Sequence, residues 1–120
     1  MKILVADDNA DAADTLALLL RMYGHVTTVA RDGGEAVTAC AEFQPDVALL
    51  DIGMPVMDGY QVARRLRDDT ASAGVLLAAI TGWGQSADKR RAHEAGFDLH
   101  FTKPVDLDQL LAALAAGRAA

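Results

Sequence analysis

The residues of this sequence that could do chemistry stand directly after short apolar segments: Asp7, Asp8, Asp51, Thr81 and Lys103. A carboxylate at the end of a buried strand lies where open α/β sheets place their ligands. Three carboxylates within a few ångströms of one another raise each other's pKa unless a cation keeps them ionised. Mg²⁺ or Mn²⁺, which prefer oxygen ligands, suit this donor set. The pattern therefore predicts a divalent-metal site made by the three aspartates.

The other polar residues complement such a metal. Lys103 supplies a compact positive charge and Thr81 a hydroxyl donor. With the metal they would surround the oxygens of a phosphoryl group during its transfer to a carboxylate oxygen of Asp51. Pro104 removes a backbone donor next to Lys103 and is a candidate for a cis peptide bond. Alone, each residue has an ordinary explanation as a helix cap, turn residue or surface lysine, but their combination favours a site.

The elements that must position these residues alternate between two hydrophobic periods. Short apolar or β-branched runs predict strands, and each run is followed by apolar residues at helical spacing. We expect the strands at residues 2–6, 25–29, 47–50, 75–80 and 98–102. Capping boxes at Asp58 with Gln61 and at Asp106 with Gln109 predict where the third and fifth helices begin.

Five strands that alternate with five helices predict an α/β fold with a parallel sheet covered on both faces. The first, third and fourth strands are continuously apolar, so they should be central, whereas the second and fifth carry polar residues. This pattern matches a doubly wound, flavodoxin-like sheet of order 2-1-3-4-5. In that order, the strand ends bring the five candidate residues to one edge.

Composition limits the classes of protein that fit. The 120 residues suit one domain, residues 1–120, and Cys40 is the only cysteine. With no signal-like N-terminus, this cysteine usage predicts a cytoplasmic protein. The apolar runs are too short for membrane insertion, and a net charge of −6 argues against direct binding of nucleic acid. We interpret the basic clusters at residues 64–67 and 89–91 as solvated helix faces.

From residue 2 to about residue 114, the sequence resembles a response-regulator receiver domain of two-component signalling. The motifs that carry the resemblance are Asp7-Asp8, Asp51 followed by Met54-Pro55 and Asp58-Gly59, Thr81-Gly82, and Lys103-Pro104. The stretches 81–85 and 95–106 are similar, more narrowly, to receivers of hybrid sensor histidine kinases.

The resemblance implies a role for each site residue. Asp51 would accept a phosphoryl group from a histidine kinase or a histidine phosphotransfer protein. Asp8, Asp51 and the Gly53 carbonyl would bind Mg²⁺ directly, and Asp7 would act through a bound water. Lys103 would pair with the phosphoryl oxygens, and Thr81 would move toward them. The domain would catalyse its own phosphorylation and dephosphorylation rather than act as an enzyme on other substrates. The sequence leaves its oligomeric state open between a monomer and a weak dimer.

The sequence departs from the family at position 100. The family usually has Tyr or Phe there, which rotates during switching, whereas this chain has His100. We expect His100 to couple to Thr81 more weakly and with some pH dependence, because imidazole titrates near neutrality. Trp83 could shield the phosphoryl group from water, or lie on the loop without a role.

Three other functions fit the sequence less well. A phosphatase of the haloacid-dehalogenase type needs an acid two residues after its nucleophile, but Asn9 and Gly53 stand two residues after Asp7 and Asp51. A nucleotide-binding module is supported only by Gly82-Trp-Gly84, a weak signal. A receiver that docks without phosphorylation usually lacks an acidic or lysine position, and none is missing here.

Overall fold

The computed structural model describes residues 1–69, 72, 74–82 and 86–119. Strands and helices alternate along the whole of this chain: β1 (Lys2–Ala6), α1 (Ala10–Met22), β2 (Val26–Ala30), α2 (Gly33–Phe43), β3 (Val47–Asp51), α3 (Gly59–Asp68), β4 (Leu76–Thr81), α4 (Ser86–Ala95), β5 (Leu99–Thr102) and α5 (Leu107–Ala119). The second, fourth and fifth strands begin one residue later than the sequence analysis predicts.

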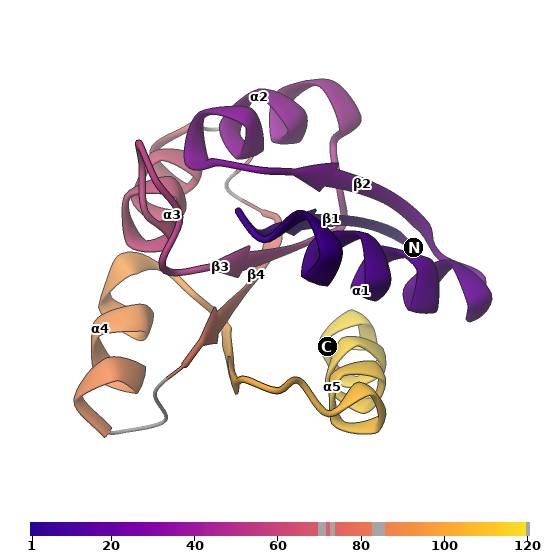
Figure 1. Ribbon diagram of the computed structural model, residues 1–120. Coiled ribbons are helices and arrows are strands. Elements are labelled where there is room, and N and C mark those ends of the chain that lie inside the picture. Colours follow the sequence, from indigo (N-terminus) through magenta and orange to yellow (C-terminus); the bar gives the residue numbers. More distant parts are fainter. Residues whose placement is uncertain (70–71, 73, 83–85, 120) are drawn as a thin grey trace.

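The strands form one parallel, five-stranded sheet of order β2-β1-β3-β4-β5, which confirms the predicted fold class and strand order. Helices α1 and α5 cover one face, and α2, α3 and α4 cover the other (Figure 1). In β3, Val47 and Leu49 pack toward α1 and α5, whereas Ala48 and Leu50 pack toward α2 to α4. Apolar residues on both faces therefore make β3 a central strand whose last residue is Asp51.

Local sequence signals explain where α3 and α5 begin. Before α3, the Asp58 side chain accepts a hydrogen bond from the Gln61 amide, and the Gln61 side chain accepts one from the Asp58 amide, each at 2.9 Å. This is the predicted capping box. At the start of α5, Asp106 Oδ1 accepts a hydrogen bond from the Gln109 amide at 3.1 Å.

The interpretation of the basic cluster 64–67 as a solvated face is wrong for Arg67, whose side chain is partly buried and hydrogen-bonded. Its guanidinium donates to the carbonyls of Gly96 and Val75 at 2.9 and 2.6 Å and to Asp98 Oδ2 at 2.6 Å. The side chain is only 24% exposed. Arg67 therefore ties the end of α3 to the segments that lead into β4 and β5. The signal lay in its helical spacing from Tyr60 and Ala63, two buried residues.

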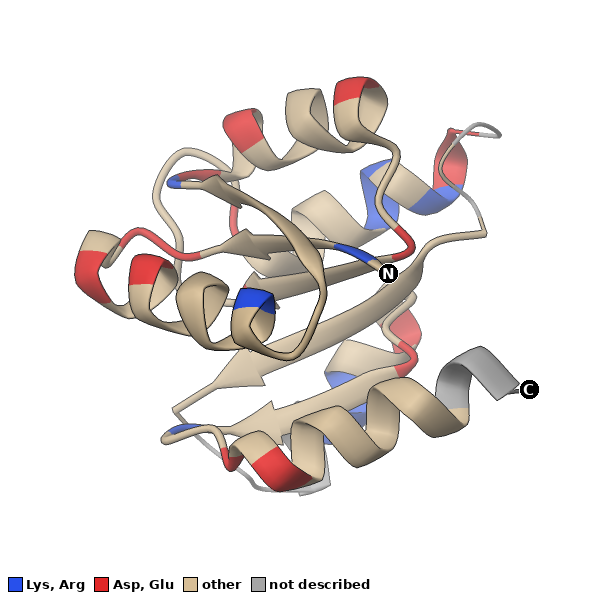
Figure 2. Cartoon of the chain, turned by 90° about the vertical axis from the view of Figure 1, so that its right-hand side faces the viewer, with Lys and Arg blue, Asp and Glu red and all other residues tan. Residues whose placement is uncertain are grey.

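The charged surface is unevenly distributed over the described chain. Acidic residues lie along α1 and α2, whereas α5 carries a single acidic residue, Asp108, in its first turn (Figure 2). Cys40 is buried, as expected for a free cysteine, and burial raises the pKa of its thiol to about 11. Within the described ranges, every helix falls short of the length and apolar character needed to cross a membrane.

Candidate functional site

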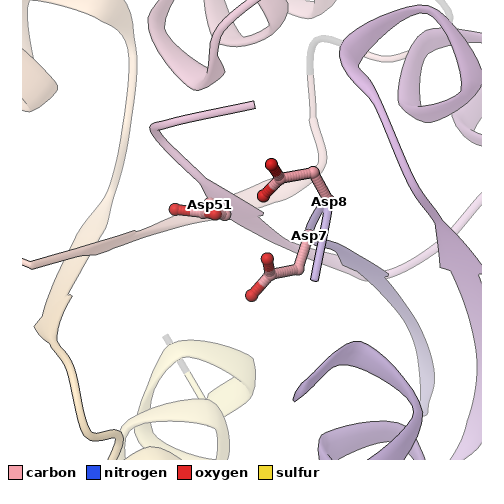
Figure 3. A group of neighbouring side chains, drawn as sticks. All are labelled: Asp7, Asp8 and Asp51. Carbon is pink, nitrogen blue, oxygen red and sulfur yellow. The ribbon is translucent and has the colours of Figure 1, made fainter. Parts of the chain in front are cut away.

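The predicted site residues meet at the carboxyl edge of the sheet. Asp7 and Asp8 follow β1, and Asp51 ends the neighbouring strand β3, so the three carboxylates turn toward a common space (Figure 3). One carboxylate oxygen from each lies within 4.8 Å of the other two. Asp7 and Asp51 are buried and Asp8 is exposed. The arrangement leaves the group accessible from solvent on the side of Asp8.

Lys103 brings a positive charge to the same place. Its Nζ lies 3.3 Å from Asp51 Oδ2 and 3.7 Å from Asp7 Oδ2. The Lys103 amide donates to the Thr81 carbonyl at 2.7 Å, which joins the ends of the fourth and fifth strands. The following peptide bond, Lys103–Pro104, is cis. The ammonium group is thus positioned between two carboxylates that would otherwise repel each other.

The electrostatics of Asp7 fit a bound cation. Burial, more than any other cause, raises the pKa of Asp7 above its ordinary value of 3.8, and the nearby Asp51 carboxylate raises it further. The Asn9 amide, which donates to Asp7 Oδ1 at 2.9 Å, and Lys103 oppose this rise without cancelling it. Keeping Asp7 ionised therefore costs stability, and a divalent cation among the three carboxylates would remove that cost. The donor set fits Mg²⁺.

This electrostatic cost predicts the behaviour of Asp7→Asn. Because the pKa of Asp7 is raised on folding, the metal-free protein loses stability as pH rises from the ordinary value of 3.8 through the raised value. Asp7→Asn should remove this loss, so its free energy of unfolding without metal should exceed that of the parent at pH 7. Urea unfolding with and without Mg²⁺ tests this prediction. Mg²⁺ should stabilise the parent and the control Asp11→Asn more than it stabilises Asp7→Asn, which loses one carboxylate of the group.

Glycines set the position of the loop that follows Asp51. The Gly53 amide donates to Asp51 Oδ1 at 3.2 Å. A Cβ added to Gly59 would lie 2.9 Å from the Asp51 carbonyl oxygen, and one added to Gly33, at the start of α2, would lie 2.1 Å from the Met57 carbonyl oxygen. Gly33 thus allows the first turn of α2 to support this loop at close range, a contact that sequence reasoning missed.

We expect Gly33→Ala to displace the loop at Met57, because its new Cβ cannot share space with a backbone carbonyl. The affinity for Mg²⁺, measured by NMR titration, should fall, and so should the melting temperature. Gly34→Ala is the matched control, since a Cβ there meets only Asp32 Oδ1, at 3.3 Å. Equal Mg²⁺ affinity and equal melting temperatures in the two variants would contradict the role given to Gly33.

Thr81 and His100 are in contact. Thr81 ends β4 and is 3% exposed, and its Oγ1 lies 3.2 Å from His100 Nε2 on β5. In the ladder between these strands, Ala79 pairs with His100 and Thr81 with Thr102, so Thr81 and His100 extend from the same face of the sheet. The structure therefore brings together the two residues that the sequence analysis couples. Trp83 lies outside the described residues.

Comparison with known proteins agrees with this geometry. Residues 3–115 match the family described as "Response regulator receiver domain". PilH of Pseudomonas aeruginosa is 34% identical over 110 residues, which make up 92% of this chain and 91% of PilH. The regulator RpaA of Synechocystis is 34% identical over 115 residues, or 96% of this chain but 48% of RpaA. The chain thus spans about half the length of some curated relatives.

Among solved structures, the receiver domain of sensor histidine kinase PA1611 from Pseudomonas aeruginosa PAO1 has a TM-score of 0.86 and 28% identity, over 94% of this chain and 93% of that domain. That structure has a magnesium ion coordinated in its active-site cleft. The receiver domain of Francisella response regulator 1452 gives a TM-score of 0.88 and 29% identity, over 96% of this chain and 93% of that domain. The family match over most of the chain, together with these relatives, shows that the chain belongs to the response regulator receiver domains.

Proposed function

We propose that this chain, as a single receiver domain, accepts a phosphoryl group on Asp51 from the phosphohistidine of a histidine kinase or a histidine phosphotransfer protein. The observation that carries the proposal is the grouping of Asp7, Asp8 and Asp51 within 4.8 Å, with Lys103 Nζ 3.3 Å from Asp51 Oδ2. Phosphorylation would change the conformation of the domain and the partners it binds.

Asp8, Asp51 and the Gly53 carbonyl would hold Mg²⁺ or Mn²⁺ directly, with Asp7 acting through a water. The bound ion supplies positive charge that neutralises the carboxylates and the phosphoryl oxygens. The PA1611 receiver, which holds magnesium in its cleft, supports this assignment.

The chemistry of transfer follows from the side chains present. An Asp51 carboxylate oxygen attacks phosphorus as the bond from phosphorus to the donor's imidazole nitrogen breaks, and the imidazole keeps the electron pair. Lys103, already beside Asp51, would move its ammonium contact to a phosphoryl oxygen, and the Thr81 hydroxyl would donate to another. Attack of water on the resulting acyl phosphate would return free Asp51 and inorganic phosphate. Almost all of the catalysis would be positioning and electrostatics.

The phosphodonor protein would dock on the groove beside the site. This groove, of about 750 Å³, opens at Asp7 and Lys103 and runs along α1. Its apolar lining comes from α1, β4 and the segment after β5: Leu16, Leu19, Ile80, Pro104 and Val105. A helix that carries the phosphohistidine could place apolar side chains there while its imidazole faces Asp51.

Mixing the protein with acetyl phosphate and Mg²⁺ tests the proposed function. We expect a gain of one phosphoryl group in intact mass, absent without the metal and absent in Asp51→Asn. No gain from acetyl phosphate, and none from a phosphorylated histidine kinase, would rule the function out.

We further propose that His100 reports the phosphorylation. The Thr81 hydroxyl contacts His100 in this structure, and a phosphoryl group on Asp51 would compete for that hydroxyl. His100→Ala should therefore change the active-state population that NMR measures in the presence of Mg²⁺ and beryllofluoride. An unchanged population would remove His100 from the switch, while His25→Ala, a histidine that contacts the N-terminal amine, serves as control.

We also propose that the domain is of the hybrid sensor kinase type and acts in the cytoplasm. The similarity to the PA1611 receiver and the single, buried cysteine support these two assignments. Phosphotransfer profiling against purified histidine kinases and phosphotransfer proteins would identify its partner. Preferential loading by a phosphotransfer protein is the result expected of a hybrid-kinase receiver.

A further inference from the structure

The hydroxyl of Thr81 has one proton to donate and two neighbours that can accept it. Thr81 ends β4 and is 3% exposed, and its Oγ1 lies 3.2 Å from Nε2 of the half-buried His100 on β5. In the proposed function, the same hydroxyl donates to a phosphoryl oxygen on Asp51. Because a hydroxyl carries a single hydrogen, Thr81 cannot donate to His100 and to the phosphoryl group at the same time.

The protonation state of His100 decides which hydrogen bond Thr81 can make. A neutral imidazole has one ring nitrogen that accepts, so Nε2 can take the Thr81 proton. In the imidazolium form both ring nitrogens carry hydrogen, so Nε2 can only donate. Thr81 Oγ1 then accepts from His100, and its own proton is left for the phosphoryl oxygen. Imidazole changes between these forms at about pH 6.5 in peptides, within the range of cellular pH.

The charges around His100 leave both forms of the ring accessible. Among the described residues, the charged side chains that line the pocket beside His100 are Lys89 on α4 and Asp106 before α5, one of each sign. Helix α5 itself contributes the uncharged Gln109, and β4 has no charged residue. The Lys103 ammonium is turned away to the aspartates of the site. These surroundings do not hold His100 in one protonation state.

A phosphoryl group on Asp51 would add negative charge to this arrangement. Strand β4 lies between β3 and β5, Asp51 pairs with Ile80 in the ladder of β3 and β4, and Thr81 follows Ile80 directly. The added charge therefore lies across Thr81 from His100, where it favours the imidazolium. The hydrogen bonds then run in one direction, from His100 to Thr81 and from Thr81 to the phosphoryl oxygen, so that each strengthens the other.

We propose that His100 makes the switch respond to protons: protonation of its imidazole stabilises the phosphorylated, active conformation by leaving the Thr81 proton to the phosphoryl group. This inference rests on the proposed function and adds the direction of the pH effect. Linkage makes the effect reciprocal, so phosphorylation favours protonation of His100 as much as protonation favours the active conformation. The response is strongest when phosphorylation and acidification coincide.

The direction is tested by NMR with Mg²⁺ and saturating beryllofluoride, which stands in for the phosphoryl group. We expect the ratio of active to inactive conformer to rise about fivefold between about pH 8 and about pH 5.5, the scale of one net hydrogen bond. His100→Phe, which lacks a titrating ring, should show no such rise. The chain has three histidines, so His25→Gln combined with His93→Gln leaves only His100 and should keep the whole effect.

A second measurement uses the parent chain alone, so it does not depend on how any variant folds. The midpoint of the His100 titration, followed through its ring resonances, should move upward by about 0.7 pH units when beryllofluoride binds, the logarithm of the same fivefold effect. Equal pH dependence in His100→Phe and the parent, or a midpoint that beryllofluoride does not move upward, would overturn the inference. A parent chain that binds no beryllofluoride at any pH would contradict the proposed function instead.

Discussion

Replacing Lys103 with alanine should slow phosphorylation by acetyl phosphate about 100-fold or more, which is the scale of losing one preorganised electrostatic group at a reacting centre. The Lys103 ammonium lies 3.3 Å from Asp51 Oδ2 and 3.7 Å from Asp7 Oδ2. Without the ammonium group, the phosphoryl oxygens lose a positive partner during transfer. The Asp7 and Asp51 carboxylates also lose the positive charge that offsets their mutual repulsion. Intact-mass kinetics at saturating Mg²⁺ measure the effect.

Two variants control for this prediction. Lys103→Arg keeps the charge but spreads it over a planar group, so it should recover only part of the rate. Lys2→Ala removes a lysine at the other end of the sheet, whose Nζ donates to the Phe43 carbonyl, and should leave the rate unchanged. Phosphorylation of Lys103→Ala at the parent rate would show that this lysine has no part in the chemistry.

Replacing Arg67 with alanine should lower the free energy of unfolding by about 3 kcal/mol. The guanidinium donates to the Gly96 and Val75 carbonyls and to Asp98. Hydrogen bonds to charged groups contribute about 1.5–3 kcal/mol each, and we reduce their sum because the side chains of Arg67 and Asp98 are 24% and 43% exposed. The variant also leaves two backbone carbonyls without this donor.

Urea unfolding of Arg67→Ala beside Arg65→Ala measures this difference. Arg65 lies on the same helix and is exposed, so its replacement should change stability by no more than about 0.5 kcal/mol. If both variants unfold at the same urea concentration, the Arg67 contacts contribute nothing measurable to stability.

The sheet order and the grouping of the site could be predicted from the sequence because both depend on short-range signals. The continuously apolar runs mark β1, β3 and β4 as central strands, and parallel strands bring their carboxyl ends to one edge. Once that edge is fixed, Asp7, Asp51 and Lys103 can lie nowhere else. The capping box at Asp58 is similarly local, since both of its partners are within one helical turn.

Other features depend on contacts between elements that are distant in sequence. A run of arginines on a helix predicts a solvated face, because it does not reveal that the carbonyls of Val75 and Gly96 lie within reach of Arg67. The close approach of Gly33 to Met57 needs the placement of α2 against the loop after β3. The positive φ of Val56 contradicts the residue's own preference, so no propensity argument could have found it.

Asp51 is the residue that carries the phosphoryl group in the proposed function. Its most direct test is to load the parent chain from a radiolabelled phosphohistidine protein in Mg²⁺, trap the acyl phosphate by borohydride reduction, and identify the modified residue by peptide mass spectrometry. We expect a single reduced aspartyl residue, at position 51, and none when Mg²⁺ is withheld. Modification at Asp7 or Asp8 instead, or label that transfers equally well to Asp51→Asn, would contradict it.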